Sequence, residues 1–291
     1  MKTKILLTIV IAFSIFTTAF AQKGLNFVFS VQPDMKMIGG DFNVPTSSGS
    51  YIPMDKKMGI GFQAGGAIGY NFTDNLGLSL GLMYSAQGQN YDDYVLSESD
   101  YNGSNFYTAT STVTRKVSLN YLKLPFQFNF NTNPANTVAF AGFAGFYLGV
   151  LLSYTDETTI NGTYNDGFGT ETYHASAIAK EDQVTYLETS SFSASESNTS
   201  PLSEKPYKTA DFGATIGAGI QLKLSDKISL PIMLNYQIGL ADVKNNGSLV
   251  THDSGDTDLY WNSFASYDDR NIAESYHNST LGLLFGLKIT L

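Results

Sequence analysis

The sequence predicts an all-β fold, an eight-stranded antiparallel transmembrane β-barrel with short periplasmic turns and long extracellular loops. Three observations lead to this prediction. Eight segments alternate large apolar residues with small or polar ones, which is the period of a strand with one apolar face. The connections between these segments alternate between very short and long. The N-terminus has the pattern of an export signal.

The export signal is expected over residues 1–21. Two lysines precede an apolar run over residues 5–20, which ends in a small-x-small triplet at Ala21. This run is shorter than the roughly 20 residues that a membrane-spanning helix needs. We therefore expect a secretory signal peptide that is cleaved after Ala21 and an outer-membrane barrel domain over residues 22–291.

The composition of the chain narrows its class. Removal of the signal would leave 270 residues and shift the formal net charge from −9 to −11, because two lysines are lost. Such an acidic chain is a poor binder of nucleic acid. The absence of cysteine excludes disulfides and thiolate metal sites. Abundant Gly (27), Tyr (18) and Phe (20) suit extended structure with aromatic belts.

The eight alternating segments are expected to be the barrel strands. They lie at residues 25–31, 58–72, 76–87, 122–130, 138–152, 212–222, 228–240 and 280–291. A soluble sandwich would bury the apolar faces and solvate the others. The opposite faces here carry Gly, Ser, Thr, Asn and Gln far more often than Lys or Glu. That composition favours a crowded barrel lumen with lipid on the apolar side.

The connections predict the topology. Short turns are expected at residues 73–75, 132–136 and 225–227, and long polar loops at 38–57, 88–113, 154–206 and 242–275. Both termini then lie on the short-turn side, and the last strand pairs with the first to close the barrel. Pro125 and Pro231 each remove a ladder hydrogen bond, so we expect a bulge or a local break at each.

Three stretches carry a family resemblance: "YLKLPFQFNF" at 121–130, "FGATIGAGIQLKL" at 212–224 and the ending "GLLFGLKITL". With the export signal, they resemble the PorT-like outer-membrane β-barrel proteins of Bacteroidota. The resemblance implies an outer-membrane location and contact with outer-membrane lipids and lipopolysaccharide. The terminal strand itself resembles the C-terminal signal by which outer-membrane barrels are delivered to the barrel-insertion machinery. The family's namesake is associated with the type IX secretion system, so the resemblance implies other envelope or secretion proteins as partners.

A polar plug is expected inside the barrel. Its members are the polar residues on the inward face of the strands: Gln63, Asn71, Lys123, Gln127, Asn129, Asp211, Gln221, Lys223, Asn235, Gln237 and Lys288. Buried charges need partners. We expect Lys123 to be hydrogen-bonded inside the plug, with Asp211 and loop carboxylates as counter-charges, and we expect the plug to hold water and not to conduct.

A candidate catalytic pair lies at the start of the last strand. His277 and Ser279 share one face of a strand, a spacing similar to that of the lipid A deacylases, which are eight-stranded barrels. The orienting acid is missing downstream, and Glu274 upstream is a weak substitute. We therefore expect no catalytic residues, with a lipid A deacylase-like hydrolase as the alternative.

Two acidic pairs in expected loops are candidate metal ligands. Asp92-Asp93 and Asp268-Asp269 could hold Ca²⁺ or bridge to lipopolysaccharide through divalent ions. Neither has the regular loop pattern of calcium ligands, and His174 and His252 have no metal-ligand spacing around them. No metal and no cofactor are expected.

The expected protein is therefore a monomeric, non-enzymatic outer-membrane barrel. Its long surface loops would mediate adhesion or docking to an envelope or secretion component of the type IX kind. The rival function is a small transporter or pore. Eight strands leave an interior that side chains can fill, so conduction would require more strands, for example an extra membrane hairpin formed from part of 154–206.

Overall fold

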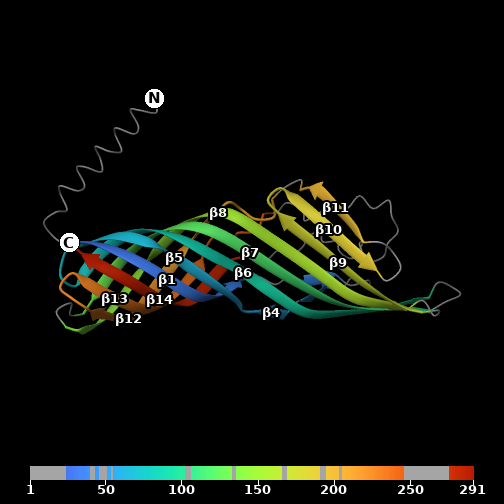
Figure 1. The fold of residues 1–291 in the computed structure, drawn as a ribbon, viewed down its shortest axis with the longest axis horizontal. Helices are drawn as coiled ribbons and strands as arrows, with labels where there is room; N and C mark the ends of the chain where they lie inside the picture. Colours follow the sequence, from blue (N-terminus) through green and yellow to red (C-terminus); the bar gives the residue numbers. More distant parts are fainter. Residues whose placement is uncertain are drawn as a thin grey trace, which may run out of the picture.

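Eight strands close into an antiparallel ring in the computed structural model, which confirms the expected barrel (Figure 1). The structure describes residues 24–39, 43–45, 51–53, 55–101, 106–132, 136–165, 169–190, 195–202, 205–245 and 275–291. In order around the ring the strands are β1 (Leu25–Ile38), β5 (Gly59–Asn71), β6 (Leu76–Tyr101), β7 (Phe106–Asn131), β8 (Val138–Asn165), β12 (Ala210–Lys223), β13 (Ile228–Gly239) and β14 (Asn278–Thr290).

The last strand closes the ring. β14 pairs with β13 on one side and with β1 on the other, with Asn26 opposite Thr290. The amide of Leu291 donates to the carbonyl of Leu25 at 2.9 Å. Both edges of the terminal strand, which has one apolar face, are thus hydrogen-bonded, so the ring has no free edge there.

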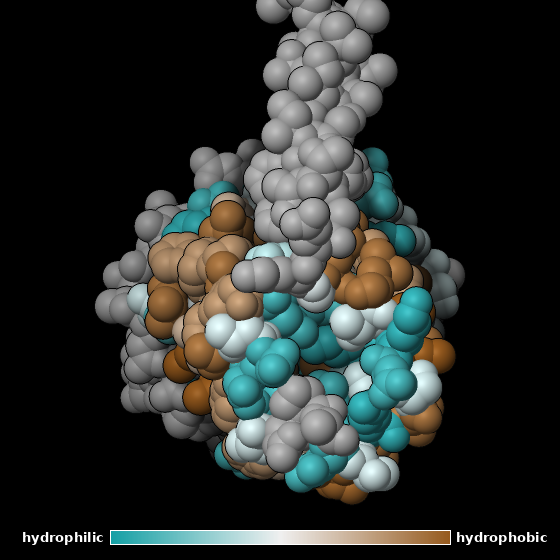
Figure 2. All heavy atoms as spheres, turned by 90° about the vertical axis from the view of Figure 1, so that its left-hand side faces the viewer, coloured by the Kyte–Doolittle hydropathy of each residue, from teal (hydrophilic) through white to brown (hydrophobic). Residues whose placement is uncertain are grey.

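Strand alternation separates an apolar exterior from a polar interior. Along β12, Phe212 and Ile216 are exposed, whereas Asp211 and Thr215 are buried. The other ring strands also expose large apolar side chains at alternate positions, among them Phe29, Ile60, Leu80, Phe126, Phe146, Leu234 and Phe285. Figure 2 shows one end of the ring, where hydrophilic residues gather toward the centre and hydrophobic ones lie around them. An exposed apolar band of this kind suits contact with lipid.

The end that carries the short turns is called the turn end here. Residues 72–75, 132–137 and 224–227 connect its strands, and Leu291 lies beside them. The side-chain amide of Asn75 donates to the carbonyls of Asn131 (2.6 Å) and Thr132 (2.9 Å), which joins two of the turns. These bonds hold the turn end together.

The opposite end continues past the ring as a second sheet. The outer parts of β6, β7 and β8 run on together, and β9 (Thr170–Lys180), β10 (Gln183–Ser190) and β11 (Glu196–Pro201) extend this sheet from β8 (Figure 1). β4 (Asp55–Lys57) pairs with β6 on the other side. We call this extension the distal sheet. A separate pair, β2 (Asn43–Pro45) with β3 (Tyr51–Pro53), completes the described strands.

The distal sheet corrects two of the expected loops. Residues 88–113 are strand except at 102–105, which are not described, and 154–206 holds the end of β8 with β9, β10 and β11. The extra hairpins therefore exist, but β9 pairs with β8 at Thr155–Asn165, outside the ring. The expectation of loops was wrong there because both faces of these strands are rich in Thr, Ser and Tyr. These residues favour strands without producing an apolar alternation.

A β-bulge marks the junction between ring and distal sheet. Asn120 on β7 pairs with Ser153, and Tyr121 pairs with Leu151, so Leu152 is an extra residue on β8. Even-numbered residues of β8 point outward up to Leu152, whereas Tyr154 is buried. Bulges re-aim side chains at barrel rims in this way.

The two strand prolines break the ladder on one side only. The pairing of β6 with β7 is interrupted next to Pro125, and that of β13 with β14 next to Pro231, without a change of register. The local break was predicted correctly, and no bulge forms. A Cβ on Gly81 would lie 2.9 Å from Pro125, and one on Gly286 would lie 2.7 Å from Pro231. The glycines thus make room for the proline rings.

The distal sheet has a core that continues into the ring, where Ile38 and Tyr121 belong to the same cluster. Its buried residues pack together as one cluster, which includes Val113, Val117, Leu119, Tyr154, Ile160, Ala179, Tyr207, Val243 and Tyr276. Inside it, Nε of Arg115 donates to Asp156 at 2.7 Å, and the hydroxyl of Tyr207 donates to the same carboxylate at 2.7 Å. Burial and this carboxylate raise the pKa of Tyr207 well above its usual value. A sheet with such a core is a folded unit and not a set of loops.

Some expectations fall outside the described residues. They concern the signal peptide over 1–21 and most of the expected loop at 242–275. Within the part of the chain that is described, no helix is long and apolar enough to cross a membrane.

Candidate functional site in the barrel lumen

Polar side chains from the inward strand faces meet in the lumen. Of the residues expected there, Gln63, Lys123, Asp211, Asn235 and Gln237 are buried. The other six are partly buried: Asn71, Gln127, Asn129, Gln221, Lys223 and Lys288. All eleven occupy inward positions, because their neighbours along each strand include the exposed apolar residues.

A chain of hydrogen bonds crosses the lumen. Nζ of Lys123 on β7 donates to Gln237 on β13 at 2.9 Å, and Gln237 donates to Gln63 on β5 at 3.1 Å. Gln63 donates in turn to Asp34 on β1 at 2.8 Å and to Thr280 on β14 at 3.3 Å. β7 and β13 are not neighbours in the ring, so these bonds span the interior. We call these five residues the central network.

Asp211 is the second acid of the lumen. It accepts hydrogen bonds from Asn278 at 3.1 Å and from the hydroxyl of Tyr147 at 3.3 Å. The ammonium of Lys123 lies 4.0 Å from the centroid of the Tyr147 ring, which adds a cation–π contact. Asn278 also donates to the hydroxyl of Tyr121 at 3.3 Å. The buried cation thus lies among an amide, an aromatic face and nearby acids.

Sequence reasoning missed several lumen residues. Asp34 is a counter-charge supplied by a strand, whereas only Asp211 and loop carboxylates were expected. Gln32 accepts a hydrogen bond from Asn235 at 2.8 Å. The others are Thr215, Thr280, Asn278, Tyr121 and Tyr147. For Gln32, Asp34 and Asn278 the missing signal was strand length, since β1 runs to Ile38 and β14 starts at Asn278. Extending the alternation would have placed these three residues inside. Tyr147, Thr215 and Thr280 lie within the expected strands, on their inward faces, but were not included in the expected plug.

A cavity of about 660 Å³ lies between the central network and the turn end. Inward residues from all eight ring strands line it, and Asn235 and Gln237 lie at its inner limit. The hydrophilic centre in Figure 2 lies at this end of the ring. The lumen therefore has a filled part toward the distal sheet and a hollow part toward the turns.

The structure does not join His277 and Ser279 as a catalytic pair. Nδ1 of His277 lies 2.9 Å from the carbonyl of Ala241, and the hydroxyl of Ser279 donates to the carbonyl of Met37 at 3.5 Å. Each side chain contacts a different neighbouring segment. Glu274, the weak candidate for the orienting acid, lies outside the described residues.

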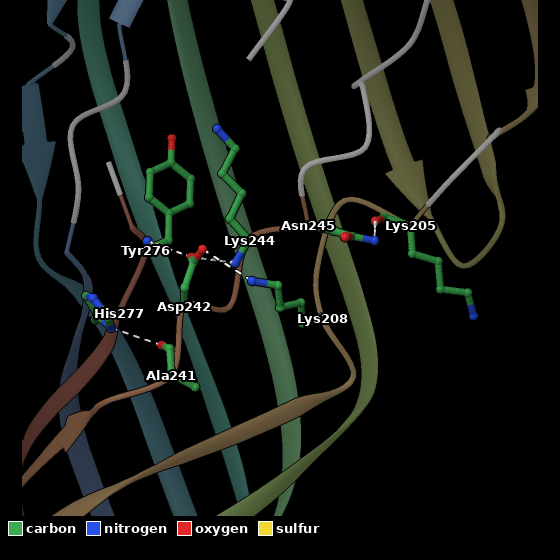
Figure 3. A network of polar contacts seen from close by, with 8 residues as sticks. All are labelled: Lys205, Lys208, Ala241, Asp242, Lys244, Asn245, Tyr276 and His277. Carbon is green, nitrogen blue, oxygen red and sulfur yellow. Dashed lines mark hydrogen bonds and ion pairs between the residues drawn. The ribbon is translucent and has the colours of Figure 1, made fainter. Parts of the chain in front are cut away.

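A polar cluster ties together three segments at the rim (Figure 3). The carboxylate of Asp242 accepts from the amides of Tyr276 (2.9 Å) and Lys244 (3.1 Å) and from Nζ of Lys208 (3.3 Å). Burial opposes the charge of Asp242, but these donors prevail and hold the pKa of Asp242 below its usual value. The cluster holds residues 205–208 and 241–245 together at the end of the ring that faces the distal sheet.

Two of the candidate metal ligands lie on strands of the distal sheet. His174 lies on β9, where Nδ1 is 2.6 Å from the side-chain oxygen of Asn161. Asp92 lies in strand β6 opposite Asp55 of β4. Asp268, Asp269 and His252 lie outside the described residues. Among the residues described, no three His, Asp or Glu side chains gather as a metal site.

Comparisons with known proteins give a family and distant folds. A family model described as "Outer membrane protein beta-barrel domain" matches residues 20–245. Among solved structures, the attachment invasion locus protein Ail of Yersinia pestis is 12% identical, with 92% of this chain and 100% of that chain covered and a TM-score of 0.33.

Two further structures are similar at the same distant level. Neisserial surface protein A is 9% identical over 92% of this chain and 99% of that chain, with a TM-score of 0.30. The Pseudomonas putida toluene transporter TodX is 12% identical over 94% of this chain and 91% of that chain, with a TM-score of 0.21. No curated protein sequence matches the chain. The family match spans most of the chain, and it is this match that shows the family.

Proposed function

This chain belongs to the outer membrane protein beta-barrel domain family and lies in the outer membrane, and we propose that its barrel anchors the distal sheet as a partner-binding head. The partner is another component of the cell envelope, such as a secretion protein, or a surface to which the cell adheres. The barrel itself performs no chemistry. Its task is to hold the head at a fixed height and orientation.

The observation that carries this proposal is the continuity of three strands. β6, β7 and β8 each pass from the ring into the distal sheet as a single strand, and β6 and β7 pair, with one register shift between Tyr91 and Tyr94, up to Tyr101 opposite Phe106. A head connected by paired strands cannot turn independently of the barrel in the way that one on a flexible linker can. Such rigid presentation lowers the entropy lost on binding.

The orientation follows from the connections. In outer-membrane barrels the short turns face the periplasm and the long connections face outward. The turn end of this ring then faces the periplasm, and the distal sheet stands outside the cell. Thr185 on β10 and Thr199 on β11 join side chains at 3.2 Å on this sheet. A surface rich in hydroxyls suits a partner recognised by hydrogen bonds.

The lumen supports an anchor better than a pore. Lys123 is only 1% exposed, and the central network connects strands on opposite sides of the ring. The extra strands β9–β11 lie outside the ring, so they do not widen it. An eight-stranded barrel filled in this way has no continuous path for solutes.

The topology is tested with single cysteines, because the chain has none of its own. Asn165→Cys at the end of β8 and Asn75→Cys in a turn are treated with a membrane-impermeant maleimide on intact cells. We expect labelling at 165 and not at 75. Labelling of 75 alone would show that the barrel has the opposite orientation.

Docking is tested with a photo-reactive group at position 185 and, as the matched control, at position 75. Cross-linking in living cells should capture a specific protein or surface polymer from 185. A second variant replaces residues 170–201 by a short Gly-Ser linker and carries the photo-reactive group on a part of the distal sheet that remains. This replacement should abolish capture while the ring stays folded. Capture that survives this deletion, or none from the distal sheet in any condition, would contradict the docking function.

A further inference from the structure

The cavity at the turn end has the size of a ligand site. Its volume is about 660 Å³, within the range of roughly 300–1,000 Å³ that small-molecule sites occupy. It is closed at one end by Asn235 and Gln237 and reaches the turn residues at the other. The charged and the apolar side chains that line it lie at different depths along the barrel axis.

Two lysines lie in one cross-strand row near the turn end of the cavity. Ser229 on β13 pairs with Lys223 of β12 on one side and with Lys288 of β14 on the other. All three residues line the cavity. Adjacent strands are roughly 4.8 Å apart, so the two lysine side chains start on either side of Ser229. This row provides donors for a single anionic group.

The charges of this row are incompletely neutralised. Lys223 forms an ion pair at 2.9 Å with Asp226, whose side chain is almost fully exposed in the turn; a pair of this kind is weak. Lys288 is opposite Val28 on β1 and Ser229 on β13. Among the described residues, no carboxylate contacts Lys288. A partly buried cation without a counter-charge favours an anion.

The wall becomes apolar deeper in the barrel. Along β13, Pro231 and Met233 follow Ser229, and along β14, Leu284 lies four residues from Lys288. Phe143 and Met233 are buried together, and Leu284 packs against them. Four strand residues span about 13 Å. A cationic rim and an apolar wall are therefore separated by the length of a short hydrocarbon chain.

We propose that this cavity binds a small amphiphilic anion that enters from the turn end. Its carboxylate, or an equivalent anionic group, would contact Lys288 and Lys223 and accept from the Ser229 hydroxyl. Its apolar tail would lie against Phe143, Met233 and Leu284. The central network closes the cavity beyond the tail, so the ligand is held and does not pass through the barrel.

Binding is measured by calorimetry with octanoate on the protein purified from membranes and placed in phosphatidylcholine nanodiscs, with empty nanodiscs subtracted. Octanol, which lacks the charge, and acetate, which lacks the tail, are the comparison ligands. We expect saturable binding of octanoate with one site per chain and at least tenfold weaker binding of the other two. Equal affinity for octanoate and octanol would overturn the role of the lysines.

Variants locate the site. Lys288→Gln should weaken octanoate binding about tenfold, and Lys288→Arg should retain it. Ala67→Phe, which places a ring in the cavity from β5, should abolish it. Lys180→Gln, on the exposed surface of the distal sheet, is the matched control and should bind like the wild type. Unchanged affinity in both folded Lys288→Gln and folded Ala67→Phe protein would refute the proposal; circular dichroism confirms folding.

Discussion

At the residue scale, the ion pair between Arg115 and Asp156 is the most sensitive point of the distal sheet. Both side chains are about 3% exposed, and Tyr207 donates a third hydrogen bond to the same carboxylate. Removing one partner of a buried pair leaves an uncompensated charge, at a cost of roughly 3–5 kcal/mol. We therefore expect Asp156→Ala to open the distal sheet, as measured by hydrogen exchange of amides 113–119 and 154–160.

The matched control is the exposed pair of Lys205 and Asp182, at 3.1 Å. Asp182→Ala should change stability by no more than about 1 kcal/mol, because solvent screens such a pair. Similar exchange in the two variants would mean that the Arg115–Asp156 pair does not stabilise the sheet. The ring amides should stay protected in both, since neither pair lies in the ring.

A pH dependence is predicted at the rim cluster. The hydrogen bonds to Asp242 lower its pKa in the folded state, so the unfolded chain binds the proton more readily. The stabilisation is then present above the unfolded value of about 3.9 and is lost as pH falls below it. We expect the protection of the Lys244 and Tyr276 amides against hydrogen exchange, relative to the intrinsic rate at each pH, to fall below about pH 4. Asp242→Asn should remove most of this acid dependence, and an unchanged acid response would count against the assignment.

At the scale of the strand, β12 allows its two faces to be compared. Ile216 is 58% exposed on the outward face, whereas Gln221 lines the cavity. Ile216→Arg should destabilise the barrel in lipid by roughly 2–4 kcal/mol if it lies near the bilayer midplane. Gln221→Ala should cost much less. Urea unfolding in lipid vesicles measures both, and equal losses would mean that the faces are wrongly assigned.

The ring strands were predictable because lipid on one side and a crowded lumen on the other impose a strict period of two. The distal sheet was not, because its strands carry hydroxyl and aromatic residues on both faces. The extra residue at Leu152 adds a second difficulty, since it reverses which positions of β8 are buried. No hydropathy pattern indicates where such a bulge falls.

The residues that line the lumen could be predicted only where the extent of the strands was predicted. Each of the eleven expected residues is at an inward position, because the alternation of side chains along a strand alone decides which face a residue lies on. Asp34 and Asn278 were missed because they lie where β1 and β14 extend beyond the clear alternation. The identity of each hydrogen-bond partner depends on register and stagger around the ring, which a single sequence does not specify.

At the scale of the whole molecule, the filled part of the lumen decides whether the barrel conducts. Gln63, Lys123 and Gln237 come from three strands and meet through bonds of 2.9 and 3.1 Å. An ion that crosses the lumen would have to break these bonds and leave Lys123 and Asp34 without partners, which is costly in a confined interior. We therefore expect no porin-like channels from the purified wild-type protein in planar bilayers.

The same network supplies the positive control for this measurement. Replacing Gln63, Lys123 and Gln237 by alanine together removes the side chains that join opposite strands, so the cavity at the turn end would extend toward the distal sheet. We expect small conductance from this variant, because the side chains that close the lumen are gone. Stable large channels in the wild type would reject the closed anchor in favour of a transporter, whereas a silent triple variant would show that the distal sheet also closes the barrel.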